Sequence, residues 1–212
     1  MTAIGQIERL TQNRVLNLLH NRLDYEYLGN WEDRENNSNI ETDILRKYLT
    51  DKGYSQTLIT KAIYQLTQAA TNQTKNIYYI NQDVYNLLRY GVKVKDDVGE
   101  NTQTVELIDW EHPKDNRFAV AEEVTIRGQN NKRPDIVLYI NGIAVAVIEL
   151  KRSTISVSEG IRQNLDNQKD VFIQQFFSTI QLIMAGNDTE GVRYGTIETP
   201  KNIISHGKKK AI

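Results

Sequence analysis

The chain has 212 residues, of which 25% are charged and 39% hydrophobic, with a formal net charge of −1 and no cysteine. This length supports one sizeable domain or a domain with an appendage, and the composition is ordinary for a globular protein. The composition excludes disulfides, thiolate metal sites and cysteine nucleophiles, and the lack of a secretory leader pattern or a membrane-length apolar run predicts a cytoplasmic protein.

The first 90 residues are predicted to be helical. Apolar residues recur at helical spacing near the N-terminus: Ile4, Ile7, Val15, Leu18, Leu19 and Leu23. This helix is expected to end near Asp24, before a polar loop over residues 29–39. Further helices are expected over 40–49, after the N-cap residue Ser55, and around 83–89 before Gly91. We interpret the region as a scaffold, with an arm packed on the core or a partner-binding surface as the alternatives.

From Gly91 the pattern changes to short β-branched and aromatic runs, which predict strands. The expected strands are 92–94, 102–108, 118–126, 136–140, 143–148, 179–184 and 192–197. Ser156 and Glu159 have the spacing of a capping box and predict a helix before the last two strands. The order of elements predicts an α/β fold, a mixed sheet flanked by helices, with an N-terminal helical region.

The two most continuous apolar runs, 136–140 and 143–148, are joined by Asn141-Gly142. This dipeptide between two apolar runs is a strong signal for a β-hairpin. Strands without polar alternation are typical of the middle of a sheet that is covered on both faces. We therefore place this hairpin at the centre of the fold.

Charged residues flank the hairpin: Asp135 precedes it, and Glu149 and Lys151 close it. A regular two-residue turn would place the two carboxylates on opposite faces of the sheet, whereas a three-residue loop with a bulge at Gly142 would bring all three charges onto one face. Two carboxylates suit a hard cation such as Mg²⁺, which can polarise a phosphoryl oxygen. Lys151 would orient water or neutralise developing charge.

Pro134-Asp135 followed by Glu149-Leu150-Lys151 fits the PD-(D/E)xK nuclease signature. The bare pattern is weak, because its gap is variable and its residues are common. An Asp that caps a turn and a solvated Glu–Lys pair explain the same letters. The position of each charge at the end of a buried strand favours the nuclease.

Longer runs resemble a known family. KRPDIVLYINGIAVAVIELKRS, EGIRQNLDNQ, FFSTIQLIMAGNDT and RYGTIETP closely resemble the N-terminal endonuclease domain of the restriction (R, motor) subunit of type I restriction–modification enzymes. The likeness extends upstream through IERLTQNRV, NSNIE, YGVKV, LIDW and AEEVTI, and so covers nearly the whole chain to about Pro200.

The resemblance implies a PD-(D/E)xK core and Mg²⁺-dependent cleavage of double-stranded DNA. It also implies a longer subunit whose motor lobes bind ATP, assembled with modification and specificity subunits. This chain contains no GxxxxGK[ST] phosphate loop, so we expect no ATP hydrolysis from it.

Site residues can be carried over where the letters match. Asp135 and Glu149 become metal ligands, and Lys151 becomes the water-orienting or charge-stabilising residue. The family also has a Gln-xxx-Tyr element on the following helix. Gln163 matches its first position and is a candidate catalytic helper, but Asn167 stands where the family has Tyr. A solvated helix Gln is the alternative for Gln163.

Three more residues are weaker candidates. Nucleases of this fold can add an acidic residue from the first helix, and Glu8 is in that position, although an early Glu also favours the helix dipole. Lys132 and Arg133 flank the expected metal site and are predicted to contact DNA phosphates, with surface solubility as the alternative.

The favoured function is that of a DNA endonuclease domain acting within a larger ATP-driven complex. The alternative is a non-catalytic DNA-binding or subunit-docking module, and a net charge of −1 counts modestly against tight DNA binding by this chain alone. The predicted organisation is a helical region over residues 1–90, packed on a nuclease core over 91–200.

After Pro200 the resemblance stops, and residues 201–212 show neither strand nor helix period, which predicts an unstructured tail. In the related subunits the chain continues with something like Pro-Glu-Lys-Tyr-Tyr-Leu-Thr-Trp-Lys-Glu. Codons can be chosen for residues 202–210 that encode much of this run when read two nucleotides later. We hypothesise that the tail is a frameshifted reading, with a deliberately cut domain as the alternative.

Overall fold

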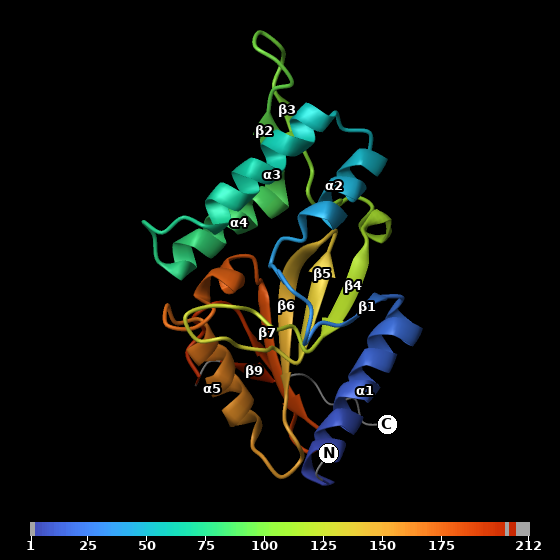
Figure 1. Cartoon of the computed structure of the whole chain (residues 1–212), viewed down its shortest axis with the longest axis vertical. Coiled ribbons are helices and arrows are strands. Elements are labelled where there is room, and N and C mark those ends of the chain that lie inside the picture. Colours follow the sequence, from blue (N-terminus) through green and yellow to red (C-terminus); the bar gives the residue numbers. More distant parts are fainter. Residues whose placement is uncertain (1–2, 202–203, 207–212) are drawn as a thin grey trace.

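The computed structural model describes residues 3–201 and 204–206 (Figure 1). Its helices are α1 (Ala3–Leu23), α2 (Thr42–Asp51), α3 (Gln56–Ala70), α4 (Ile77–Tyr90) and α5 (Val157–Asn167), with 3₁₀ turns η1 (Pro113–Asp115) and η2 (Gln174–Ser178). Its strands are β1 (Glu26–Asn30), β2 (Val92–Val94), β3 (Gln103–Val105), β4 (Phe118–Glu122), β5 (Ile136–Ile140), β6 (Ile143–Leu150), β7 (Leu182–Asn187), β8 (Gly191–Gly195) and β9 (Ser205–His206). Among these residues no helix is both long and apolar enough to cross a membrane.

The main sheet has seven strands in the order β1-β4-β5-β6-β7-β8-β9. Its β1–β4 and β6–β7 pairs are parallel, and the remaining neighbours are antiparallel. The mixed sheet flanked by helices confirms the predicted α/β class. β1 lies in the region that was predicted to be helical. The strand was not predicted because it is short and pairs with a strand about ninety residues later, so its local sequence carries little signal.

The hairpin β5–β6 lies at the centre of the sheet and both of its faces are covered. On one face, Val137 and Val147 pack with Phe177 of η2. On the other face, Ile136 and Ile148 pack with α1 through Leu16 and Leu19. The buried stripe of α1 differs from the predicted one, because Leu18 is 44% exposed and Leu23 is 55% exposed.

A second core lies above the turn of the hairpin, where α2, α3 and α4 gather around the β2–β3 ribbon (Figure 1). Ile143 of β6 is part of this core. The predicted helix signals are confirmed: Ser55 Oγ accepts a hydrogen bond from Leu58 N, and Gly91 follows α4 with a φ of 72°. α4 begins earlier than predicted, at Ile77.

The hairpin turn differs from the predicted one. Ile140 pairs with Ile143, and Asn141 and Gly142 have φ values of 53° and 87°, so the connection is a regular two-residue turn. The extra residue is instead Val145, because Tyr139 pairs with Ala144 and the next partner along β6 is Ala146. The bulge was predicted at Gly142 and lies at Val145, so its predicted position was wrong. Either position turns the side chains of Asp135 and Glu149 to the same face of the sheet.

Gly142 also holds the helical region to the turn. Its carbonyl accepts a hydrogen bond of 2.8 Å from Glu41 N, and a Cβ at Gly142 would lie 2.8 Å from both the Glu41 carbonyl oxygen and Ile44 Cβ. Gly142→Ala should lower the free energy of unfolding by about 2–4 kcal/mol, from a left-handed φ plus a clash that the backbone must relieve.

Gly53→Ala is the matched control for that change. Gly53 has a φ of +85°, but no heavy atom lies within 4 Å of its added Cβ, so only the left-handed penalty of about 1 kcal/mol is expected. Urea unfolding of both variants measures the difference. Equal losses would show that contact with α2 contributes nothing at the turn.

Part of the predicted unstructured tail is ordered. Ser205 and His206 form β9, which pairs with Tyr194 and Arg193 of β8, and Ile204 packs beside α5. The short length of this strand explains why no period was visible in the sequence. Residues 202–203 and 207–212 lie outside the described part, so the frameshift hypothesis stays a prediction.

Candidate active site

Strand register brings the two predicted carboxylates to the same end of the sheet. Ile136 pairs with Ile148, so the next position outward sets Asp135 opposite Glu149. Because side chains of directly opposed residues lie on one face, both point to the face covered by α5 and η2. The predicted geometry of the pair is therefore found, with the bulge at Val145 as its cause.

Glu149 is buried, with an exposed fraction of 1%. Its Oε1 accepts a hydrogen bond from Gln163 Nε2, whereas its Oε2 has no hydrogen-bond partner among the described residues. Lys151 Nζ lies 4.0 Å from that oxygen, beyond hydrogen-bond range. Burial, followed by the negative charge of Asp135, raises the pKa of Glu149 well above its usual value.

Two main-chain N–H groups donate hydrogen bonds that fix the strand ends around the pair. Asp135 Oδ2 accepts a 2.6 Å hydrogen bond from Leu150 N, and so takes the place of a main-chain carbonyl of a paired strand. Lys151 N donates a 2.8 Å bond to the Gly186 carbonyl, which continues the pairing of β6 with β7. The backbones that carry the three predicted charges are therefore held in place.

Helix α5 reaches the site because it carries a glycine where it meets the sheet. A Cβ at Gly160 would lie 3.1 Å from Ala185 Cβ, 3.5 Å from Lys151 Cγ and 3.6 Å from Glu149 Cβ. One turn later, Gln163 contacts Glu149. Asn167, at the position of the family Tyr, is buried and its Oδ1 has no partner in the described part of the chain.

The donor set of the pair suits a divalent cation. A buried carboxylate oxygen without a donor is costly, and a cation at this point would satisfy it. Both groups supply hard oxygen ligands, and the mutual repulsion of the carboxylates falls when a cation lies between them. The residues present therefore fit the metal that the family resemblance implies.

The predicted DNA-contacting residues both have protein partners. Arg133 Nε lies 2.8 Å from Glu123 Oε2, and Arg133 also pairs with Glu32. Lys132 Nζ lies 4.1 Å from the centre of the Phe172 ring. These contacts hold the two cations in the segment that leads to Asp135 and β5, and their role towards DNA stays a prediction.

The first helix reaches this end of the sheet through a residue that was not among the predicted site residues. Gln12 Nε2 donates to Glu122 Oε2 at 2.9 Å and to Glu123 Oε1 at 3.0 Å, and lies 3.4 Å from the Asp135 carbonyl oxygen. The available signal was that Gln12 is a polar residue on the buried stripe of Leu16 and Leu19. The side chain of Glu8 lies outside the described part.

Glu122, beside Glu123, is fully engaged by the protein. It is 2% exposed, and it accepts hydrogen bonds from Arg9, Gln12 and Tyr27. Burial and the bond to Glu122 raise the pKa of Tyr27 to about 12. Glu122 is therefore a structural anchor for α1.

A separate acidic group lies near α2. Ligand atoms of Asp109, His112 and Asp115 lie within 4.8 Å of one another. Lys52 Nζ, however, lies 2.7 Å from Asp109 Oδ2 and 3.8 Å from Asp115 Oδ2. Because an ammonium already neutralises this group, it is a poorer cation site than the buried pair at Asp135.

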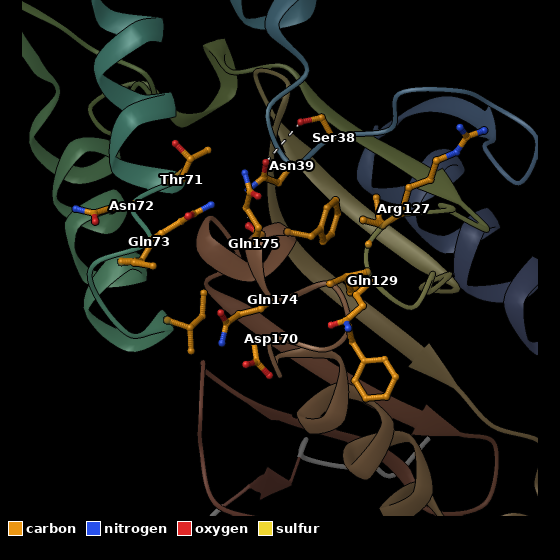
Figure 2. A pocket seen from close by; sticks show the side chains of 18 of the residues that line it. Ser38, Asn39, Thr71, Asn72, Gln73, Arg127, Gln129, Asp170, Gln174 and Gln175 are labelled. Atoms are coloured by element: carbon orange, nitrogen blue, oxygen red, sulfur yellow. Dashed lines mark hydrogen bonds between the residues drawn. The ribbon is translucent and has the colours of Figure 1, made fainter.

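A cleft of about 550 Å³ lies between the α3–α4 connection, the segment after β4 and η2 (Figure 2). Side-chain amides line it: Asn39, Asn72, Gln73, Gln129, Gln174 and Gln175. None of the predicted site residues is in this lining, so the cleft is separate from the carboxylate pair.

Comparisons with known proteins support the resemblance. The family described as "Type I restriction enzyme R protein N terminus" matches residues 6–202. The chain is 29% identical over 144 residues to the "Type I restriction enzyme HindI endonuclease subunit" of Haemophilus influenzae, a match that covers 62% of this chain and 13% of that relative. It is 32% identical over 120 residues to the "Putative type I restriction enzyme MjaIXP endonuclease subunit" of Methanocaldococcus jannaschii, covering 53% of this chain and 11% of the relative.

Proposed function

Because the chain belongs to the family of type I restriction enzyme R protein N termini, we propose that it is the endonuclease domain of an R subunit. Its matches span only 13% and 11% of the first two relatives, so the activity of the whole enzyme belongs to the proposal. The proposed reaction is metal-dependent hydrolysis of DNA phosphodiester bonds. The organisation we propose is a helical region over 1–90 and a nuclease core over 91–200, with α1 and β1 packed into the core.

The proposed roles follow from the contacts at the sheet end. Asp135 and Glu149 hold the cation, and Gln163 fixes the orientation of Glu149 through Oε1. Lys151 follows the end of β6, two residues after Glu149, where its ammonium can hold an attacking water or neutralise charge on the phosphate. A bound cation would polarise the phosphoryl oxygen and lower the pKa of a bound water.

One observation carries this proposal: the buried Oε2 of Glu149 without a hydrogen-bond partner, opposite a second carboxylate. A purely structural carboxylate at this depth would be expected to accept hydrogen bonds at both oxygens. Mg²⁺ is the proposed ion, because oxygen ligands and phosphate substrates suit it. The proposed partners are double-stranded DNA and the modification and specificity subunits of a restriction complex.

Metal binding by the purified chain tests the proposal. Titration with Mn²⁺ and Mg²⁺ should show one strong site that Glu149→Gln removes, and Mg²⁺ should support nicking of supercoiled plasmid. Asp109→Asn is the matched control, because it removes a carboxylate from the other acidic group and should leave the strong site unchanged. Loss of binding in Asp109→Asn with retention in Glu149→Gln would contradict the assignment, and a chain with no divalent site would favour a non-catalytic docking module.

A further inference from the structure

Gln12 joins α1 to the end of the sheet that carries Asp135. It is 4% exposed, and its Nε2 lies within hydrogen-bond distance of three acceptors: Glu122 Oε2, Glu123 Oε1 and the Asp135 carbonyl oxygen. The amide group has two protons to share among these acceptors. Two of the three are carboxylates, and bonds to charged acceptors are the stronger ones. Gln12 is therefore firmly oriented towards the strand end.

Glu123 is the residue through which this contact reaches the site. It follows β4 with a φ of 51°, an uncommon backbone conformation for a residue with a long side chain. Its N donates a 2.9 Å bond to the Asp135 carbonyl, which joins it directly to a proposed metal ligand. Such strained residues persist when their surroundings hold them in place.

Two side chains hold the carboxylate of Glu123, one at each oxygen. Gln12 binds Oε1 at 3.0 Å, and Arg133 Nε lies 2.8 Å from Oε2. The same Gln12 amide lies behind the Asp135 main chain, on the side of the sheet covered by α1. α1 thus contacts the main chain of one proposed metal ligand both directly and through Glu123.

We infer that Gln12 is a positioning residue for the cation site, acting through Glu123 and the Asp135 carbonyl. This inference rests on the proposed function. Residues that hydrogen-bond to metal ligands and orient them typically lower the metal affinity by about 10–100-fold when they are mutated. The Gln12 amide contacts two carboxylates and the Asp135 carbonyl oxygen, so its loss removes one of the contacts that hold this end of the sheet without removing a ligand.

The test measures the Mn²⁺ affinity of the purified chain by calorimetry. Gln12→Met keeps a side chain of similar length but removes the donor, and should weaken Mn²⁺ binding about ten-fold. Asn13→Ala, an exposed neighbour on α1, should leave the affinity unchanged. Urea unfolding of each variant shows whether the domain is folded at the temperature of the titration.

A double-mutant cycle separates positioning from a general packing effect. If Gln12 acts through Glu123, Gln12→Met should weaken Mn²⁺ binding less in a Glu123→Gln background than in the unaltered chain. Equal affinities of Gln12→Met and the unaltered chain overturn this inference alone, and strictly additive effects in the cycle overturn the part of it that runs through Glu123. An unaltered chain that binds no Mn²⁺ overturns both this inference and the proposed function.

Discussion

Asp135→Asn should abolish DNA cleavage by an assembled restriction enzyme whose R subunit carries this chain as its N-terminal domain. The change removes the charge of a proposed metal ligand but keeps an oxygen that can accept the bond from Leu150 N. Loss of outer partners alone costs about 10–100-fold in metal affinity or activity, so loss of a direct ligand should cost at least about 100-fold in the cleavage rate. Conversion of supercoiled to linear plasmid measures it.

Asp135→Ala is the comparison that separates chemistry from folding. Alanine removes the charge of Asp135 and also the oxygen that accepts the hydrogen bond from Leu150 N. Leu150 is a buried residue. Sequence reasoning alone would predict only a relief of repulsion with Glu149, whereas the hydrogen bond adds a cost of about 1–3 kcal/mol when its acceptor is lost. Asp135→Ala should therefore be less stable than Asp135→Asn, although neither cleaves. Full cleavage by Asp135→Asn would contradict its role as a ligand.

Glu149→Gln should stabilise the metal-free chain while it abolishes divalent binding. At neutral pH the buried carboxylate is raised in free energy by desolvation and by the charge of Asp135. Glutamine keeps the shape and removes the charge, so the free energy of unfolding should rise by about 1–3 kcal/mol, the usual cost of an unsatisfied buried group. Thermal and urea unfolding in the presence of a chelator measure the gain.

The sign of this effect with pH follows from the same shift. Folding raises the pKa of Glu149 above its usual value of 4.5, so the folded state favours the protonated side chain. The stability that the protonated side chain contributes is therefore present in full below pH 4.5. It is lost as the pH rises through the raised pKa. The stability gap between Glu149→Gln and the unaltered chain should therefore widen from pH 4.5 upward, and a constant or narrowing gap would contradict the assigned cause.

The central hairpin could be predicted because its signals are local. Two apolar runs around Asn141-Gly142 define both strands and the turn, and the charges that flank the runs define the candidate site. The caps at Ser55 and Gly91 are local for the same reason. Each of these features depends on residues within a few positions of one another.

The features that were missed depend on residues far apart in the chain. The bulge at Val145 has no signature of its own, since Val fits a regular strand equally well, and only the pairing of β5 with β6 shows the extra residue. β1 exists because β4 lies beside it. Gln12 acquires its role from contacts with residues more than a hundred positions away, and helical spacing alone cannot indicate them.

The sharing of the hairpin between two cores has a consequence for local unfolding. Ile143, at the turn, is covered by the helices around α2, while Val147, farther along β6, belongs to the core under η2. Ile40 and Asn39 also join the turn end through a β-bridge and a main-chain bond to Ala144. Opening of the helical region would expose one end of the strand that carries Glu149, so we expect the two cores to open as a single cooperative unit in native-state hydrogen exchange.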